Sequence, residues 1–529
     1  MQQVNSVKRK YTIFYLLSII ILGLGIRFYI FPFEVPIATD GYFSFVYAVK
    51  TVFEQGMPSN IITTNTGWSN LLSTLFFFTD TSEPMHLMQI QRSLSVFFSV
   101  ATTIPTFFLL QRFVNRKFAL SGALLIAIEP RLLLLSIEGV NFSLYVFLVV
   151  LAITLFFKKT NLGITLSFIC ISCATLVRYE AMLLLIPFAS MYLIRFKTKK
   201  SILKLLGMLI IFCLIILPFI TLRMEATEEY CYVSPFGEIC GFDGIISNFF
   251  NRIQDIDNKI TGVPDIDDPI YNVEGPMIDH FIFLSLSNFI KFFGLILIPI
   301  FIFSISIGIF ILIKKRKFNF NFEHKFLIFC TIVSVLPGLY AYGRGIEETK
   351  YVLIAIPLLC LISAYSIKFL SKNRVIFIVI IFACILTSGL FIEYEKKDNA
   401  FEYESYIISK KIEDVAKGVN PYEYAGFVKN AKLEKQWNNL SEIRNLKELQ
   451  EFDKVSYENS TNLEQYIKNS DGRLTHIVVY EQNAAQPKFL EMIFREGDEI
   501  KYLELVFDSK NSDFQNAVKI FRINYDLIT

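Results

Sequence analysis

The chain has 529 residues, of which 53% are hydrophobic and only 19% charged, and its formal net charge is +3. A soluble protein this apolar would have too little polar surface to face water, so the composition excludes a wholly soluble protein and predicts that lipid surrounds much of the chain. The small net charge gives no indication of a nucleic-acid partner, and we expect none.

The first element is a basic segment followed by an apolar run. The letters MQQVNSVKRK precede an apolar stretch from Tyr11 to about Ile30. A signal peptide starts in the same way, but this stretch is long enough to span a bilayer and no small-residue cleavage site follows it. We therefore predict an uncleaved transmembrane helix with its N-terminus in the cytoplasm.

Apolar runs of spanning length recur over the first 393 residues. A bilayer needs about 17–25 residues, and several runs are short enough to leave one broken or re-entrant helix open. We predict about eleven spans in a mainly α-helical, polytopic bundle. They lie near residues 11–30, 87–111, 118–136, 140–157, 162–177, 180–196, 202–222, 288–313, 325–342, 350–368 and 374–393.

Clusters of basic residues fall on every second boundary between these spans. Such clusters face the cytoplasm, and all six agree when the N-terminus is inside. The odd number of spans then places residues 394–529 outside, together with outer loops 31–86 and 223–287. We therefore expect the chemistry on the outer face. The clusters are Lys8–Lys10, Arg112 with Arg116 and Lys117, Lys158 with Lys159, Arg195 with Lys197–Lys200, Lys314–Lys317, and Lys368–Arg374.

Residues 394–529 differ in character from the first 393. They are rich in Lys, Glu, Asn and Tyr, and apolar alternation at 476–480, 502–507 and 517–523 predicts strands. Helices are predicted over 401–417 and 441–452. We expect a small α+β extracytoplasmic domain, without a His/Cys cluster or a Gly-rich phosphate loop.

Two of the eight cysteines lie in the long outer loop, whereas the other six lie inside predicted spans and read as small buried apolar residues. Pro235 and Gly237 stand between Cys231 and Cys240 and suit a turn that brings the two together. Outside the cell a disulfide is favoured over two free thiols, and metal binding is the least favoured because no His accompanies them.

A single acid, Asp40, lies about ten residues after the first predicted span and directly before an aromatic amphipathic stretch. Ionisable groups at the bilayer are costly, so they are usually paired or functional. Asp40 is either the N-cap of a helix over residues 41–54, a common use of Asp, or a reactive carboxylate at the outer interface, and the two uses are compatible.

Glu138 lies in an outer turn between two spans. A predicted helix break, flanked by charged residues, precedes this turn. Pro130 should interrupt the helix of span 118–136 between Glu129 and Arg131. As simple surface features, Glu138 is an exposed turn carboxylate and the other two residues are a surface charge pair. As part of a site, Glu138 is a second outer carboxylate.

The next outer turn holds the triplet Arg178, Tyr179 and Glu180 directly between two apolar spans. The triplet is either a hairpin that keeps its polar head in water or an anion-binding site. By itself, this local pattern favours the hairpin.

Two cations, Arg344 and Lys350, lie with glycines at the last short outer loop. They are suited to clamp a lipid phosphate. The alternative is that they neutralise Glu347 and Glu348 at an exposed turn.

Metal and nucleotide motifs are not recognisable. The Asp-rich segment 255–268 does not match the spacing of a calcium-binding loop and reads as a solvated loop. The four His residues are scattered. The cofactor is therefore left unknown, a divalent cation included.

Together these segments resemble the GT-C superfamily of polytopic membrane glycosyltransferases, especially its protein-mannosyltransferase-like, polyprenyl-phosphate-sugar-dependent branch. The resemblance covers about residues 1–393. Many relatives have two adjacent acids where this chain has one, and the Trp-Trp-Asp-Tyr-Gly motif of oligosaccharyltransferases is missing, so we do not predict that activity. The matching pieces are Asp40–Tyr42, Glu138 with Gly139, the turn Leu176–Ala181, and the run from Arg344 through Lys350 to Pro357.

The resemblance implies an inverting glycosyltransferase of the cell membrane. It would transfer a sugar from a polyprenyl- or dolichyl-phosphate donor to a protein, lipid or glycan acceptor on the outer face. Asp40 would be the general base and Glu138 would orient the acceptor or assist the base. The implied substrate- and phosphate-binding residues are Arg178, Tyr179, Glu180, Arg344 and Lys350.

Two other classes of function stay open. The first is a transporter or flippase of a lipid-linked substrate, against which stand the few charges inside spans and the lack of paired broken segments in the sequence. The second is a non-catalytic surface-assembly protein, for which eleven spans would be excessive.

Overall fold

Contacts between residues divide the protein into two compact units. The membrane unit comprises Met1–Phe31, Thr39–Thr79 and Ile90–Ile392, and the second unit comprises Pro32–Ala38, Asp80–Gln89 and Glu393–Thr529. The computed structural model describes residues 2–33, 35–37, 39–58, 66–79, 84–227, 277–314, 321–343, 345–371, 373–395, 407, 424–425, 462–469, 476–481, 488–509 and 517–528.

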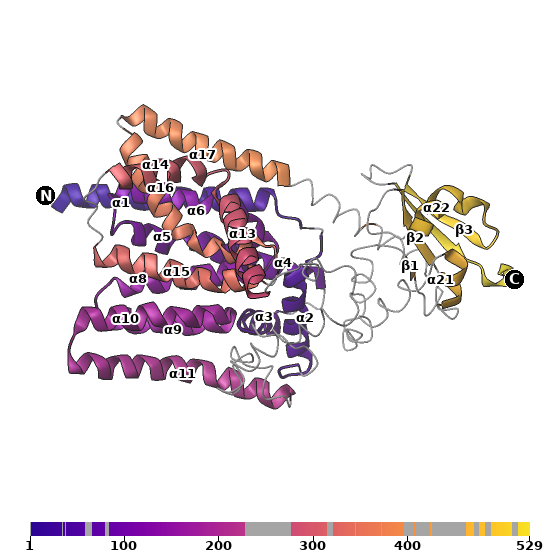
Figure 1. Cartoon of the computed structure of the whole chain (residues 1–529), viewed down its shortest axis with the longest axis horizontal. Helices are drawn as coiled ribbons and strands as arrows, with labels where there is room; N and C mark the ends of the chain where they lie inside the picture. Colours follow the sequence, from indigo (N-terminus) through magenta and orange to yellow (C-terminus); the bar gives the residue numbers. More distant parts are fainter. Residues whose placement is uncertain are drawn as a thin grey trace. The chain divides into compact units, whose positions relative to one another are not determined.

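Helices make up nearly all of the described membrane unit (Figure 1). Their residues are mostly apolar, as a helix needs when lipid or other helices surround it. The helices are α1 (Gln2–Tyr29), α2 (Thr39–Phe53), α3 (Gly67–Phe77), α4 (Pro84–Ala101), α5 (Thr103–Leu110), α6 (Arg116–Ala127), α7 (Pro130–Ile137), α8 (Phe142–Phe156), α9 (Asn161–Val177), η1 (Tyr179–Leu184), α10 (Leu185–Phe196), α11 (Lys199–Thr227), α13 (Met277–Leu297), α14 (Phe301–Lys314), α15 (Phe322–Gly343), η3 (Thr349–Tyr351), η4 (Leu353–Ala355), α16 (Ile356–Leu370) and α17 (Arg374–Glu395).

Each predicted span corresponds to one helix or to a run of consecutive helices, whereas α2 and α3 lie between predicted spans. Within the described residues, seven segments are long and apolar enough to cross a bilayer, and two bent pairs and two shorter apolar helices, α8 and α9, complete the set. The bent pairs are α6 with α7, at 47°, and α13 with α14, at 105°. The prediction of a polytopic helical bundle is confirmed, and the protein is a multi-pass membrane protein.

The break between α6 and α7 occurs at Pro130, as predicted. Glu129 caps α7 by accepting a hydrogen bond from the backbone nitrogen of Leu132 at 2.6 Å. The carbonyl of Ala127, left free where α6 ends, accepts a hydrogen bond from the buried Arg27 of α1 at 2.8 Å. Glu129 and Arg131 do form a charge pair, at 4.0 Å, but the interpretation of it as a surface pair is wrong, because the Glu129 side chain is buried. Its hydrogen bond satisfies a backbone donor that the start of α7 leaves free.

Aromatic rings fill the space between the long helices. Phe156 of α8, Phe188 of α10 and Phe326 of α15 pack with ring centroids 4.5–5.0 Å apart. Figure 1 shows α9 between α8 and α11, and these neighbours are in contact. Such packing replaces the hydrophobic effect as the main source of association inside a bilayer.

Two shorter helices, α2 and α3, pack against each other at one end of this bundle, and α2 runs across the direction of the long helices (Figure 1). The start of α3 lies directly on the end of α9. A Cβ atom on Gly67 would stand 2.5 Å from the carbonyl carbon of Leu176, so only glycine allows this approach. The contact places α2 and α3 beside the turn that carries Arg178.

The second unit contains a four-stranded sheet in the order β1-β2-β4-β3. Strand β1 is parallel to β2, and the other neighbours are antiparallel. The three predicted strands are confirmed, whereas the helices predicted over 401–417 and 441–452 lie outside the described residues. The elements are β1 (Tyr424–Ala425), α21 (Leu463–Asn469), β2 (His476–Tyr480), α22 (Lys488–Glu496), η6 (Gly497–Glu499), β3 (Leu503–Asp508), β4 (Val518–Ile523) and η8 (Tyr525–Leu527).

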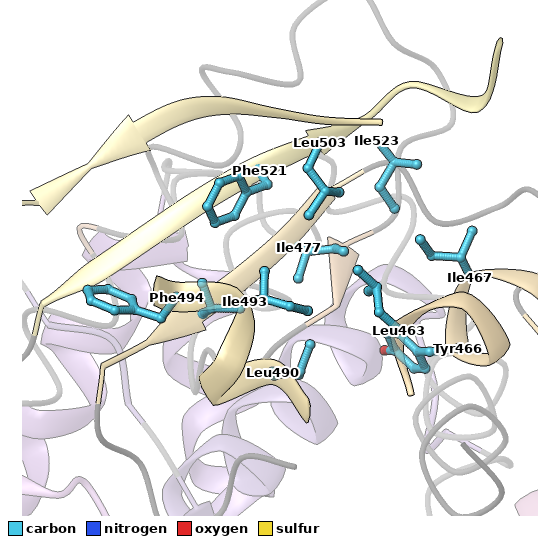
Figure 2. Close-up of a cluster of buried hydrophobic side chains, with 11 residues drawn as sticks. Leu463, Tyr466, Ile467, Ile477, Leu490, Ile493, Phe494, Leu503, Phe521 and Ile523 are labelled. Atoms are coloured by element: carbon cyan, nitrogen blue, oxygen red, sulfur yellow. The ribbon is translucent and has the colours of Figure 1, made fainter. Parts of the chain in front are cut away.

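Figure 2 shows the core of this sheet, where strand residues meet two amphipathic helices. Ile477 of β2 and Phe521 of β4 point toward α21 and α22, which supply Tyr466 and Ile493. Alternate residues of each strand face the same side, which is why the period-2 pattern in the sequence located these strands.

Candidate active site

Asp40 and Lys350, far apart in the sequence, form an ion pair. Asp40 lies in the first turn of α2, and its Oδ2 accepts a hydrogen bond from Lys350 Nζ at 2.7 Å. The Asp40 side chain is 64% exposed and the Lys350 side chain 17%. α2 begins at Thr39, so Asp40 lies inside the first turn of the helix and not before it. A negative charge in the first turn interacts favourably with the helix dipole.

Lys350 also pairs with Glu348, so one ammonium lies between two carboxylates. The neutralisation interpretation from the sequence is therefore correct in part. Glu347, the other acid of that turn, pairs instead with Lys291 at 2.6 Å, where both side chains are about half exposed. Lys350 is the cation that connects this loop to α2.

Glu138 ends α7 and is the third acid of this region. Gly139 follows it with φ of 72°, a left-handed conformation that favours glycine and turns the chain into α8. Part of the Glu138 side chain is open to solvent, but protein surrounds its carboxyl on most sides. This desolvation, and next the negative charge of Asp40, raise the pKa of Glu138 to about 7, against the opposing effect of Lys350.

A buried glutamine joins the two carboxylate-bearing segments. Gln91 of α4 donates from Nε2 to the carbonyls of Gly41, at 2.9 Å, and Gly139, at 2.8 Å. Trp68 of α3 donates to the same Gly139 carbonyl at 3.1 Å. Gln91 is completely buried. It therefore sets the spacing between the first turn of α2, with Asp40, and the turn with Glu138.

The sequence analysis missed Gln91 and its neighbour Arg92, which donates to the carbonyl of Ile137 at 2.8 Å. Both belong to the predicted span 87–111. A polar pair in an apolar span is costly unless it is bonded, and that cost was the signal that could have identified them.

Arg178 and Glu180 form a second, buried ion pair. Arg178 Nη2 lies 2.6 Å from Glu180 Oε1, and both side chains are about 10% exposed. The guanidinium is within 6 Å of the ring centroids of Phe142, Tyr145 and Tyr351. The interpretation of a hairpin with its polar head in water is therefore wrong, because both charged side chains are buried.

The residue between this pair, Tyr179, is half-buried and begins η1. α15 approaches η3 closely, since a Cβ atom on Gly338 would lie 3.0 Å from the Tyr351 Cβ. This contact brings the loop that carries Lys350 and Tyr351 close to Arg178. Tyr351 thereby joins the aromatic rings around Arg178.

A small pocket, part of it open to solvent, is lined by residues of both ion pairs. Arg178 and Glu180 line it together with Lys350, which contacts Asp40 outside it. Three of the sequence-predicted residues, Arg178, Glu180 and Lys350, therefore line one pocket. Asp40 reaches it only through its contact with Lys350, and Glu138 is not among the lining residues. The other lining residues are Phe142, Tyr145, Ser334, Pro337, Gly338, Tyr351 and Ile354.

Some predicted residues lie outside the described part of the chain. These are Arg344, the Asp-rich segment 255–268, and the pair Cys231 and Cys240. Among the residues that the structure does describe, no group of three or more His, Cys, Asp or Glu side chains is arranged to hold a metal ion.

No protein-family model and no curated protein matches this sequence. Solved structures are similar in fold. ArnT from Cupriavidus metallidurans, bound to undecaprenyl phosphate, aligns with a TM-score of 0.53 and 9% identity over 96% of this chain and 98% of that chain. The oligosaccharyltransferase of Archaeoglobus fulgidus, tethered with an acceptor peptide, aligns with a TM-score of 0.50 and 11% identity over 88% of this chain and 69% of that one. AglB from the same organism, with an inhibitory peptide and dolichol-phosphate, gives 0.50 and 12%.

These similar structures are GT-C polytopic membrane glycosyltransferases. At such low identities the likeness establishes the fold, and the fold of this protein is the GT-C fold. The fold implied by the sequence resemblance is confirmed.

Proposed function

We propose that this protein is a membrane glycosyltransferase that moves a sugar from a polyprenyl-phosphate carrier to an acceptor on the outer face of the cell membrane. The observation that carries the proposal is the Asp40–Lys350 contact, with Glu138 beside it, at one end of a GT-C bundle. Similar structures contain undecaprenyl phosphate or dolichol-phosphate, which supports a lipid phosphate as the carrier.

In this mechanism Asp40 is the general base. Its carboxylate is open to solvent, so an acceptor hydroxyl can approach it. The acceptor oxygen attacks the anomeric carbon of the donor as its proton passes to Asp40. The bond from the anomeric carbon to the phosphate oxygen breaks, and its electron pair leaves with the lipid phosphate. A single displacement of this kind inverts the anomeric configuration.

Lys350 stabilises the leaving phosphate. Its ammonium has three donors, of which Asp40 and Glu348 occupy two. A charge-assisted hydrogen bond to a phosphate oxygen strengthens as negative charge develops there, so it lowers the barrier rather than only tightening binding. Arg344, six residues earlier in the same loop, is the second cation proposed for the phosphate.

Glu138 assists Asp40. With its pKa raised to about 7, it changes charge near neutral pH. Above that value its carboxylate holds the acceptor hydroxyl for Asp40, and below it the protonated form competes for the same hydrogen bond.

The proposed orientation follows the basic clusters in the sequence. The N-terminus is cytoplasmic, and residues 394–529 are extracytoplasmic. Outer loops 31–86 and 223–287 shape the acceptor side, and a disulfide between Cys231 and Cys240 stabilises the second loop. The acceptor is a protein, a lipid or a surface glycan.

The proposal is tested by sugar release in detergent. Purified wild-type and Asp40→Asn proteins are incubated with a panel of radiolabelled polyprenyl-phosphate sugars, and label leaving the carrier is measured. We expect release by the wild type alone. Equal release by Asp40→Asn would remove Asp40 from the reaction.

One observation favours a second candidate, a flippase of a lipid-linked substrate. Interrupted spans are typical of transporters. The described residues contain two, α6 with α7 and α13 with α14, whereas only the break at Pro130 was predicted from the sequence. A flippase moves its substrate across a vesicle membrane without cleaving it. Protection of a labelled polyprenyl-phosphate sugar inside proteoliposomes, with no release in detergent, would therefore support this candidate.

A further inference from the structure

One buried carboxylate oxygen in the pocket has no hydrogen-bond partner. Glu180 uses Oε1 for the ion pair with Arg178, at 2.6 Å. Its Oε2 is buried and, within the part of the chain that the structure describes, accepts no hydrogen bond. Buried polar atoms in folded proteins are almost always bonded, so an exception in a pocket indicates a ligand.

The location of Glu180 relates this oxygen to the proposed reaction. Glu180 lines the same pocket as Lys350, and Lys350 contacts Asp40 at 2.7 Å. A donor whose phosphate lies at Lys350 can therefore extend its other end toward Glu180.

The Arg178–Glu180 pair is a poor site for phosphate. Glu180 already neutralises Arg178, and its own carboxylate repels an anion. Three aromatic rings cover the guanidinium, which leaves little of it for a bidentate phosphate contact. Arg178 and Lys350 therefore have different proposed roles, although the resemblance in sequence assigned both to phosphate binding.

The same features suit a neutral, hydroxyl-bearing ring. A sugar hydroxyl donates to a carboxylate oxygen, and the apolar face of a sugar packs on an aromatic ring such as the half-buried Tyr351.

We propose that Glu180, held by Arg178, accepts a hydrogen bond from a hydroxyl of the donor's sugar, and that Tyr351 packs against that sugar while Lys350 takes the phosphate. The inference rests on the proposed function, because it places the two ends of the same lipid-phosphate sugar. It assigns sugar selection to the Arg178–Glu180 pair.

The test separates binding of the sugar from binding of the lipid phosphate. Dissociation constants are measured in detergent for decaprenyl phosphate and for decaprenyl-phosphate hexoses and pentoses, on an Asp40→Asn background that prevents turnover. The readout is the sugar increment, defined as the Kd of decaprenyl phosphate divided by the Kd of each sugar-bearing lipid. We expect at least one sugar to give an increment on the order of tenfold, the usual size for one hydrogen bond to a charged group.

Adding Glu180→Gln should reduce this increment to about one and leave the Kd of decaprenyl phosphate within about twofold, since only one charge-assisted bond is lost. Retained decaprenyl phosphate binding shows that the variant is folded. Tyr351→Leu, which keeps the ion pair, should reduce the increment if Glu180→Gln does not fold. Glu347→Gln is the matched control, because Glu347 pairs with Lys291 outside the pocket, and it should change neither constant.

The possible failures are distinguishable. An unchanged increment in Glu180→Gln and Tyr351→Leu, or no increment for any sugar, with decaprenyl phosphate still bound, would overturn the inference and leave the transferase proposal standing. No binding of any of these lipids by folded protein would count against the proposed function itself.

Discussion

The two ion pairs of the membrane unit differ in their exposure to water, and this difference separates their roles. Asp40–Lys350 has one largely exposed partner, whereas both partners of Arg178–Glu180 are about 90% buried. An exposed pair contributes little stability and breaks easily, but removing one partner of a buried pair leaves an uncompensated charge. The first pair can exchange partners during a reaction, and the second holds a fixed geometry.

The largest expected effect comes from breaking the buried pair. Arg178→Ala leaves the Glu180 carboxylate buried without its cation, which should cost about 3–5 kcal/mol of stability. The measurement is the unfolding temperature in detergent, which should fall. The double variant Arg178→Met with Glu180→Leu should recover most of the loss, because no buried charge remains. Equal stability of Arg178→Ala and wild type would contradict the burial of this pair.

Breaking the exposed pair should act on the reaction instead. Lys350→Gln should lower the transfer rate by about 10²–10³-fold, as expected for one lost donor to a developing charge. Stability should fall less than in Arg178→Ala, because the carboxylates of Asp40 and Glu348 are open to solvent when Lys350 is lost. Transfer rate and unfolding temperature are measured on the same preparation. Lys291→Gln is the control, because it breaks an exposed pair outside the pocket and should alter neither.

The link between the carboxylate segments should have a smaller effect. Gln91→Met keeps the volume but removes the donors to the carbonyls of Gly41 and Gly139. Misplacement of a reacting group by about 1 Å costs on the order of 10²-fold, so we expect a kcat loss of roughly ten- to a hundredfold.

The donor KM of Gln91→Met should stay within about twofold, because Gln91 does not line the pocket and only the spacing of the carboxylates changes. The pH of half-maximal rate should shift with that spacing. If the substitution only reduced the fraction of folded protein, the rate would fall but the pH profile would not move. That outcome would show that Gln91 is not a positioning residue.

The smallest effect concerns Glu138 and pH. The wild-type rate should rise as pH passes about 7, where Glu138 ionises, and Glu138→Gln should remove this inflection. The folded pKa is raised from 4.5, so between 4.5 and about 7 the folded state binds more protons than the unfolded state. The contribution of Glu138 to the free energy of unfolding of the wild type is therefore fully present below pH 4.5, and it is lost as the pH rises to about 7.

Unfolding temperatures check this sign. Relative to wild type, Glu138→Gln should gain stability at pH 8 compared with pH 5. A gain in the opposite direction would mean that the carboxyl is well solvated in the folded protein.

Several features of the fold could be predicted from local sequence patterns. A span is recognisable because about twenty consecutive residues must be apolar to cross lipid, and the break at Pro130 follows from its missing backbone donor. The strand around Ile477 was located because alternate residues face one core. Each of these depends on neighbours along the chain.

Other predictions failed because burial depends on distant elements. The position of Arg178 and Glu180 in a turn between two spans predicts that they are exposed to solvent. In the structure, aromatic rings from α8 and η3 pack around the Arg178 guanidinium. Glu129 looks like a surface acid, but its side chain is buried and caps α7. Nothing next to these residues in the chain indicates the enclosure.

By itself the sequence therefore determined the polytopic helical bundle, the strands of the second unit and the chemical types near the predicted outer turns. These properties follow from each segment's own contact with lipid or water. The tertiary structure alone decided that Lys350 meets Asp40 across 310 residues, that Gln91 joins two carboxylate turns, and that Glu180 is buried with one oxygen unbonded. Such contacts depend on how helices pack, which local periodicity does not specify.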